Sequence, residues 1–238
     1  MSQFLTEGTR DLTRGVLLAL GGGYLDGYTY LDHGRVFANS MTGNVVLLGI
    51  NCLEPSWRQG LRHLPPIVMF MLGISAARIL MVPRISAVVR KPALLVLTIE
   101  MATLAVLSFL RNTTPDIWFT MSIAFVASMQ VEIFNKIHGN TYNSTFTTGN
   151  LRTLSEGVTD WLFRGERKDA GLRIIDFSLI CVTFAFGAIL AGLLAKRMGN
   201  RALWVEILLL TCVVILTEIS PHSAGSVQRS RNRVEEKM

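Results

Sequence analysis

Two short polar segments interrupt an otherwise apolar chain, and both end in the triplet Thr-Gly-Asn. The first reads FANSMTGN at residues 37–44 and the second reads NSTFTTGN at residues 143–150. A helix that starts among Asn and Thr side chains offers free amides, a positive dipole end and neutral donors and acceptors, which suits an anion or a polar solute. The candidate substrate-binding residues are Asn39, Ser40, Thr42, Gly43, Asn44, Asn143, Thr145, Thr148, Gly149 and Asn150.

A purely structural role is the alternative for these residues. Irregular backbone at membrane depth needs internal hydrogen-bond partners, and Ser40 or Thr42 is a good helix N-cap whose side-chain oxygen accepts from an amide of the first turn. One copy alone would favour this role. Two copies at matching places make a binding site an equal alternative.

Three acidic residues fall inside apolar stretches, namely Asp26, Glu132 and Glu100. An ionised carboxylate near the centre of a bilayer costs about 2.5 kcal/mol or more, so such acids normally face protein or water and mark ion or proton pathways. We expect these three to serve ion or proton coupling. The alternatives are that Asp26 and Glu132 hydrate at the membrane surface, and that Glu100 pairs with Arg78 or is a polar residue of the bundle.

The elements that must position these residues are membrane-spanning helices. The chain of 238 residues is 50% hydrophobic and 17% charged, its mean hydropathy is +0.41, and its apolar residues fall in long blocks. Each block is close to the ~20 residues with which an α-helix crosses ~30 Å of hydrocarbon. We therefore predict an all-α polytopic membrane protein with six transmembrane helices, at 15–31, 63–83, 92–110, 115–135, 174–195 and 202–219.

The two triplets, at 42–44 and 148–150, are 106 residues apart and indicate an internal repeat. At the same offset Asp26 falls on Glu132, so an acidic residue precedes the polar segment in both halves. Each half then reads as a span, a polar segment, a short helix and two more spans. A repeat at this distance indicates duplication of a three-span unit.

Because three is odd, the halves 1–110 and 111–220 are predicted to have inverted topology, as in many secondary transporters. Glu100 also falls on Glu206 at this offset, but the surrounding sequence aligns differently, so we do not rely on that pair. The last segment, 221–238, is predicted to be a polar cytoplasmic tail.

Each half is expected to carry a short helix after its first span. The first, at about 42–53, is too short to cross a bilayer, so it is a half-helix or lies at the interface. The second, at about 148–163, has one apolar side with charged residues elsewhere, which is typical of an interfacial helix.

Small residues suggest where helices break or touch. Three consecutive glycines, Gly21–Gly23, weaken a helix by ~1 kcal/mol each relative to Ala and predict a break in the first helix. The pairs Gly73/Ala77 and Gly187/Ala191, on the second span of each half, predict close helix packing.

The net charge of +6 indicates orientation rather than nucleic-acid binding, because Lys and Arg lie in loops and tails. With an inside N-terminus, 16 of them fall inside and 7 outside, and positive residues prefer the cytoplasmic side. We expect a multi-pass protein of the cell inner membrane with both termini in the cytoplasm. A polar stretch precedes the first span and no small-residue cleavage pattern follows it, so we expect this span to be retained.

Cysteines and histidines form no ligand pattern. Cys52, Cys181 and Cys212 have no paired spacing, and no two histidines lie four apart on a helix. We therefore expect no metal and no cofactor.

The order GGGYLDGYTYL, then SMTGN with an apolar run, then TTGN followed by LSEG resembles the YoaK-like family of bacterial membrane proteins. The resemblance covers nearly the whole chain, and the Thr-Gly-Asn segments are its most specific part. It implies a membrane protein. The family is one of unknown function, so the resemblance supplies no substrate.

Together these features favour a transporter of a small polar or anionic solute, coupled to protons or another cation. The first alternative is a non-catalytic membrane protein that organises partners or lipids. An enzyme is not expected, because the chain has no nucleophile elbow, no His-Glu-x-x-His and no phosphate-binding loop. The expected partners are the lipid bilayer and the solute; whether the chain forms a homo-oligomer stays open.

Overall fold

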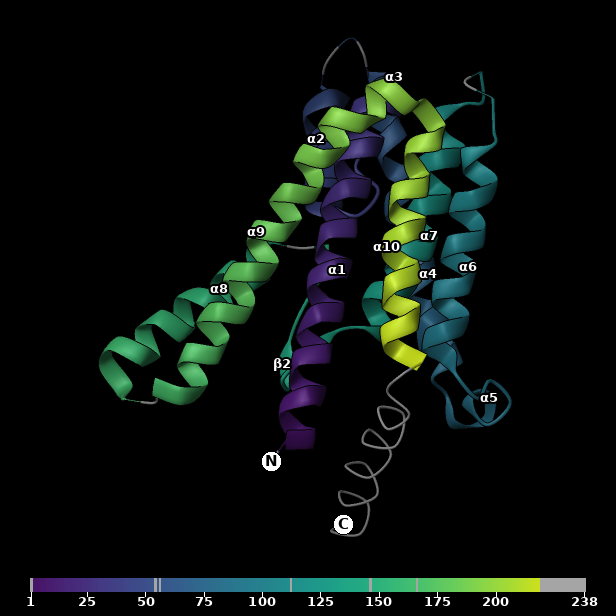
Figure 1. Cartoon of the computed structure of the whole chain (residues 1–238). Coiled ribbons are helices and arrows are strands. Elements are labelled where there is room, and N and C mark those ends of the chain that lie inside the picture. Colours follow the sequence, from purple (N-terminus) through teal and green to yellow (C-terminus); the bar gives the residue numbers. More distant parts are fainter. Residues whose placement is uncertain are drawn as a thin grey trace.

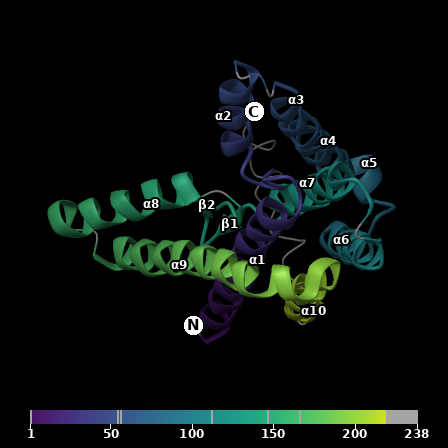
Figure 2. The ribbon, with the colours of Figure 1, turned by 90° about the horizontal axis from the view of Figure 1, so that it is seen from above.

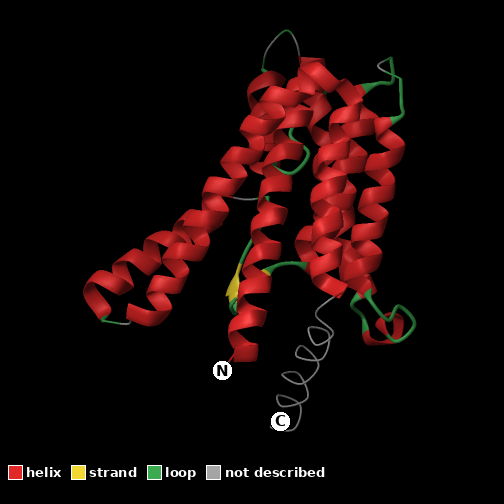
Figure 3. Ribbon diagram, viewed as in Figure 1, coloured by secondary structure: helices red, strands yellow, loops and turns green. Residues whose placement is uncertain are grey.

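The computed structural model describes residues 2–53, 55, 57–111, 113–145, 147–165 and 167–218. Apart from one pair of two-residue strands, the regular elements in this part of the chain are helices (Figure 3), which confirms the all-α prediction. The predicted tail, 221–238, lies outside the described residues. The long helices are α1 (Ser2–Asp32), α4 (Leu64–Leu80), α6 (Pro92–Ser108), α7 (Asp116–Ile133), α9 (Arg167–Met198) and α10 (Leu203–Glu218). The shorter elements are α2 (Met41–Cys52), α3 (Trp57–Gly60), η1 (Leu61–His63), α5 (Pro83–Ser86), β1 (Lys136–Ile137), β2 (Asn140–Thr141), α8 (Thr147–Thr159), η2 (Asp160–Arg164) and η3 (Gly199–Ala202).

The long helices form a bundle whose first helix begins, and whose last helix ends, at the same end. Figure 1 shows the start of α1 and the end of α10 at its lower edge. The two short helices that follow the polar segments lie at different ends, α2 near the top and α8 at the lower left. Together with the first part of α9, α8 projects from the bundle as a helical hairpin (Figure 2).

Each predicted span coincides with one of the long helices, although α1 and α9 begin earlier than expected. By length and composition, two segments of the described chain are apolar enough to cross a membrane: Trp57–Leu80, which contains α4, and Arg167–Glu218, which contains α9 and α10. The remaining helices fall short in length or hydropathy. Membrane-capable helices are therefore present, and the six-span arrangement stays a prediction.

The long helices pack across the two predicted halves rather than within them. α1 packs against α9 and α10, α7 packs against α4 and α6, and α6 packs against α10. If 106 is added to the residue numbers of α1, α4 and α6, the resulting ranges largely overlap α7, α9 and α10. The packing of α1 against α9 and α10 then corresponds to the packing of α7 against α4 and α6. The main apolar core lies where these helices meet and includes Tyr28, Leu104 and Leu210.

The triple glycine does not break the first helix. α1 is continuous through Gly21–Gly23, so that prediction is wrong. The glycines instead lie at close contacts: a Cβ on Gly23 would collide with the backbone carbonyl of Phe184 in α9, and one on Gly21 would collide with the Glu206 carboxyl in α10. Packing against these neighbours offsets the low helix propensity of glycine.

The predicted small-residue contacts are confirmed. A side chain on Gly187 would collide with the Leu20 carbonyl of α1, and Ala191 lies against Gly27. In the other half, a side chain on Gly73 would collide with Ser128 and the Phe125 carbonyl of α7. Small residues thus bring the backbones of α9 and α1, and of α4 and α7, into direct contact.

Candidate functional site

A buried carboxylate on α1 holds the first polar segment. Asp26 is only 4% exposed, and its Oδ1 accepts from the backbone amides of Asn39 at 2.7 Å and Ser40 at 3.3 Å. The Ser40 hydroxyl donates to Oδ2. Ser40 is the N-cap residue of α2, but its side chain makes no cap hydrogen bond, so the prediction of a side-chain cap by Ser40 is wrong. Its hydroxyl is already used by Asp26.

The two polar segments meet at Gly22 of α1. The Asn39 side-chain amide donates to the Gly22 carbonyl at 3.5 Å. From the second segment, the Ser144 carbonyl and the Thr145 methyl would lie 2.5 Å and 3.2 Å from a Cβ at Gly22. Asn39 and Thr145 are 106 residues apart, so equivalent positions of the two halves reach one glycine. Gly22 leaves room for the second segment because it has no side chain.

The second segment is anchored to α1 by its own neighbours. Tyr142 is buried, and its hydroxyl donates to the Gly15 carbonyl at 2.5 Å. Just before it, β1 and β2 form a short hairpin that also touches α1. The Asn143 carboxamide oxygen then accepts from the Thr145 amide and hydroxyl, both at 2.9 Å. These contacts fix Thr145 against Gly22.

This junction is polar and lies inside the molecule. Asn39, Ser144 and Thr145 are at most 2% exposed. The Asn39 Oδ1 has no hydrogen-bond partner among the described residues. A buried acceptor without a partner costs about 1–3 kcal/mol, which binding of a donor recovers. We call Asp26, Asn39, Ser40, Ser144 and Thr145 the Gly22 junction.

The two asparagines of the triplets close loops. The Asn44 side chain accepts from the Phe37 amide at 3.0 Å and donates to its carbonyl at 2.7 Å. The Asn150 side chain makes the same two bonds to Asn143, at 3.3 Å and 2.7 Å. The Oδ1 of Asn44 also lies 3.1 Å from a ring nitrogen of His63. Both asparagines are thus engaged with local structure.

Four other candidates do not join the junction. Thr42, Thr148 and Gly149 are exposed, and Gly43 lies against the Phe37 ring. The residues that the structure gathers from the predicted set are Asn39, Ser40 and Thr145, with Asn143 in support.

The acidic candidates have different surroundings. Glu132 forms an ion pair with Arg78 at 2.8 Å, so its equivalence to Asp26 does not extend to its partners. Glu100 is fully buried and accepts from the Gln130 amide at 2.9 Å, rather than pairing with Arg78. Whether these acids couple ions stays a prediction.

Glu206 on α10 is a buried acid that the sequence reasoning set aside. It is 1% exposed, and its helix packs against α6, which carries Glu100. Each of these residues has one carboxyl oxygen without a hydrogen-bond partner in the described part of the chain. The spacing of 106 residues was the signal that identifies the pair.

At the opposite end from α8, a small polar cavity of about 200 Å³ lies beside His33. The His33 ring contacts the Asp116 carboxylate at 3.1 Å and the Tyr28 hydroxyl at 2.9 Å, and stacks on Phe119. Burial lowers the pKa of His33, and this outweighs the opposing influence of Asp116. No sequence pattern predicts this network, because its members come from distant segments.

Comparison with known proteins places the chain in a family. The model of a family described as a protein of unknown function (DUF1275) matches residues 14–216. The chain belongs to this family. Among curated proteins, the UPF0700 transmembrane protein YoaK of Bacillus subtilis (strain 168) is 26% identical over 207 residues, which cover 85% of this chain and 92% of that protein. No solved structure matches.

The DUF1275 match confirms the resemblance that the Thr-Gly-Asn segments suggested, and it supports a membrane protein. It spans the whole Gly22 junction and both Glu100 and Glu206. Among the described residues, no three His, Cys, Asp or Glu side chains gather where they could hold a metal ion. The Gly22 junction offers carboxylate, amide and hydroxyl groups.

Proposed function

We propose that this protein is a membrane transporter of a small polar or anionic solute, coupled to protons or another cation. The observation that carries this proposal is the Gly22 junction, where the buried Asp26 holds the first polar segment and segments of both halves contact Gly22. A buried group of amides, hydroxyls and one carboxylate is a costly arrangement in an apolar chain. Such groups are retained where a polar ligand or ion passes.

The packing of the long helices supports a six-span, inverted-repeat arrangement for this transporter. The contacts of α1 with α9 and α10 have counterparts in those of α7 with α4 and α6. The short helices α2 and α8 lie near different ends of the bundle (Figure 1), as inverted halves require. In secondary transporters, solute sites lie at the interface of such repeats. We infer an inner-membrane protein with both termini in the cytoplasm.

Asp26 is suited to link a proton to movement of the first polar segment. As a carboxylate it accepts three hydrogen bonds from Asn39 and Ser40. A proton on Oδ2 turns that oxygen into a donor, so the Ser40 hydroxyl accepts from it instead of donating, and the charge-assisted bonds to Asp26 become weaker neutral ones. Proton uptake thereby weakens the hold of α1 on the start of α2. The loosened segment can then exchange its contacts for a solute.

Asn39 and the second segment supply solute contacts. The free Oδ1 of Asn39 accepts from a solute N–H or O–H group, while the Ser144 hydroxyl, which has no partner among the described residues, can donate to an anion. Glu100 and Glu206, buried on the packed helices α6 and α10, offer a second place for a proton or cation, since a buried carboxylate is costly without a positive charge. A transporter that couples solute movement to a cation needs both a group that binds the solute and a group that binds the proton or cation.

Uptake into proteoliposomes tests the proposal. A thermal-shift screen of polar and anionic solutes in detergent first selects ligands, because a ligand of the folded state raises its apparent stability. Uptake of a selected solute is then measured with and without a pH gradient. We expect gradient-driven uptake in the wild type and its loss in Asp26→Asn, while the exposed control Asp169→Asn retains it.

Glu132→Gln is measured as a separate arm. Because Glu132 is engaged with Arg78, we expect this variant to retain coupling and to lose some stability. Undiminished gradient-driven uptake in Asp26→Asn would remove Asp26 from the mechanism. Absence of flux for every solute, together with a stable protein partner found by crosslinking, would favour the organising role instead.

A further inference from the structure

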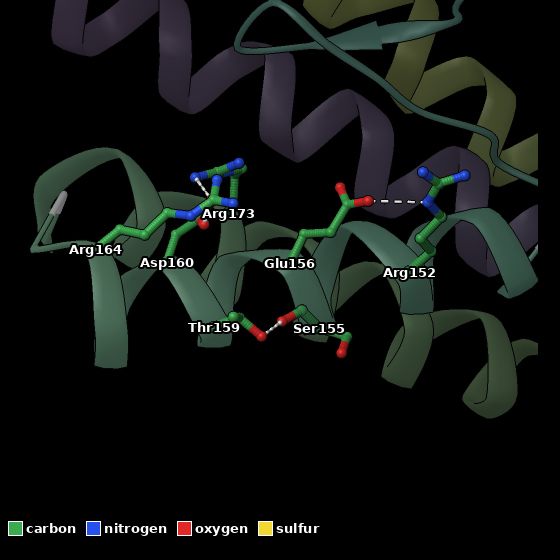
Figure 4. Close-up of a pocket in the computed structure, with 7 residues that line it drawn as sticks. All are labelled: Arg152, Ser155, Glu156, Thr159, Asp160, Arg164 and Arg173. Carbon is green, nitrogen blue, oxygen red and sulfur yellow. Dashed lines mark hydrogen bonds and ion pairs between the residues drawn. The ribbon is translucent and has the colours of Figure 1, made fainter.

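The helical hairpin outside the bundle has a cavity that none of the features above uses. The hairpin comprises α8, the π-helical turn η2 and the start of α9. Gly165, which has a φ of 75°, reverses the chain between η2 and α9. A cavity of about 520 Å³ lies on it (Figure 4). Its lining includes the three arginines Arg152, Arg164 and Arg173.

An acidic residue holds two of these arginines side by side. Asp160 is buried; its Oδ1 lies 3.2 Å from Arg164 and its Oδ2 accepts from Arg173 at 2.8 Å. Each guanidinium carries five N–H donors, so most of them stay free for another acceptor. The Nε of Arg173 is buried without a partner among the described residues.

The third arginine extends the cavity along α8. Arg152 pairs with Glu156 at 2.9 Å, one turn away, and its side chain is 82% exposed. The hydroxyl-bearing Ser155 and Thr159 complete the lining. Three guanidinium groups against two carboxylates leave one net positive charge, and planar N–H forks match the oxygens of a phosphate.

The surface next to this cavity is strongly apolar. Trp161, Leu162 and Phe163 follow Asp160 directly in η2, and Phe163 is 81% exposed. Leu151 and Val158 of α8 are exposed as well. A helix with exposed Trp, Phe and Leu beside arginines is typical of the boundary between lipid chains and headgroups.

We propose that Arg152, Arg164 and Arg173 form a binding site for the phosphate of an anionic phospholipid, with Trp161, Leu162 and Phe163 inserted among the acyl chains. Basic pockets on the cytoplasmic side of membrane proteins bind anionic headgroups in this way. The site does not depend on the transport function, since it shares no residue with the Gly22 junction.

Lipid binding to the purified full-length protein tests this site. Thermal unfolding is followed in detergent with increasing phosphatidylglycerol, with phosphatidylcholine and with inorganic phosphate. We expect phosphatidylglycerol to raise the unfolding temperature and the other two to have little effect. The variant Arg152→Gln, Arg164→Gln removes two exposed guanidinium groups, and we expect its phosphatidylglycerol affinity to fall about tenfold or more.

The matched control is Arg84→Gln, Arg90→Gln, which removes two exposed arginines from the segment around α5 at the same end of the bundle. It should retain wild-type affinity. Equal loss in both variants, or no loss in the first, would overturn the site. Stabilisation by inorganic phosphate equal to that by phosphatidylglycerol would overturn its assignment to a lipid.

Discussion

Asn44 and Asn150, 106 residues apart, make the same pair of hydrogen bonds to the backbone of the residue seven positions earlier. Each side chain thus pairs with one amide and one carbonyl, as a neighbouring strand would. Neither the bonds nor the loops they close depend on the other copy. These equivalent bonds show that the two Thr-Gly-Asn segments share local structure.

Asn44→Ala is expected to destabilise the protein by about 1–3 kcal/mol, because it leaves the half-buried amide and carbonyl of Phe37 without these partners. Asn150→Ala should act in the same direction. Asn51→Ala serves as the control, since Asn51 makes one side-chain bond within its own helix. Unfolding by denaturant in detergent measures the differences; equal effects at positions 44 and 51 would contradict the proposed loop closure.

Two glycines of α9 allow a matched comparison. A Cβ added at Gly187 would collide with the Leu20 carbonyl of α1. A Cβ added at Gly192 would have no neighbour within 4 Å among the described residues. We expect Gly187→Ala to destabilise by about 1–3 kcal/mol through overpacking. Gly192→Ala should be neutral or stabilise by up to ~1 kcal/mol through helix propensity. Thermal unfolding of the two variants distinguishes these outcomes, and similar shifts would rule out close α1–α9 contact.

His33 should make stability depend on pH. Burial lowers its folded-state pKa below the ordinary value of 6.5, so the neutral ring is favoured in the folded protein. This contribution is fully present above pH 6.5 and is lost as pH falls through the lower folded-state pKa. Asp116, Asp32 and Tyr28 face the ring, and the two acids oppose the shift.

We therefore expect the unfolding temperature of the wild type to fall between pH 7.5 and pH 5.5. In His33→Gln the fall should be smaller, because the group that binds the extra proton on unfolding is absent. The same fall in both proteins would show that other groups control stability in this range.

Asp26 and Ser40 should be energetically coupled. In a double-mutant cycle with Asp26→Asn and Ser40→Ala, we expect an interaction of about 1.5–3 kcal/mol, the range for hydrogen bonds to a charged group. The free energy of unfolding of the four proteins gives the value. Additive effects would mean that the hydroxyl does not hold the carboxylate.

Most of the helices could be predicted from the sequence, but the contacts of the site could not. Long apolar blocks predicted the helix ends within a few residues, except the starts of α1 and α9, and the repeat of Thr-Gly-Asn marked equivalent segments. The triple glycine led to a wrong prediction of a helix break. Local propensity alone favours a break, but contacts with α9 and α10 keep α1 helical. Ser40 misled for a similar reason: whether its hydroxyl caps α2 or reaches Asp26 depends on how α1 packs.

The meeting of two polar segments at Gly22 also lay beyond sequence reasoning. The offset of 106 residues identifies Asn39 and Thr145 as equivalent, but an equivalence does not give a distance. Their approach to one glycine follows from the way α1 packs in the bundle and from the anchor of Tyr142 on Gly15. Glu206 could have been found, since it stands at the repeat spacing from Glu100.

The packing of helices across the two halves determines when, during synthesis of the chain, each helix contact can form. α1 packs mainly on α9, and α4 packs mainly on α7, so a ribosome releases the first three long helices before their principal partners have been made. Until α9 has been synthesised, Gly23 and Gly27 of α1 lack the helix against which they pack in the folded protein. Completion of the fold must wait for the last quarter of the chain, and a nascent chain that stops earlier exposes Gly23 and Gly27 to any other small-residue helix nearby.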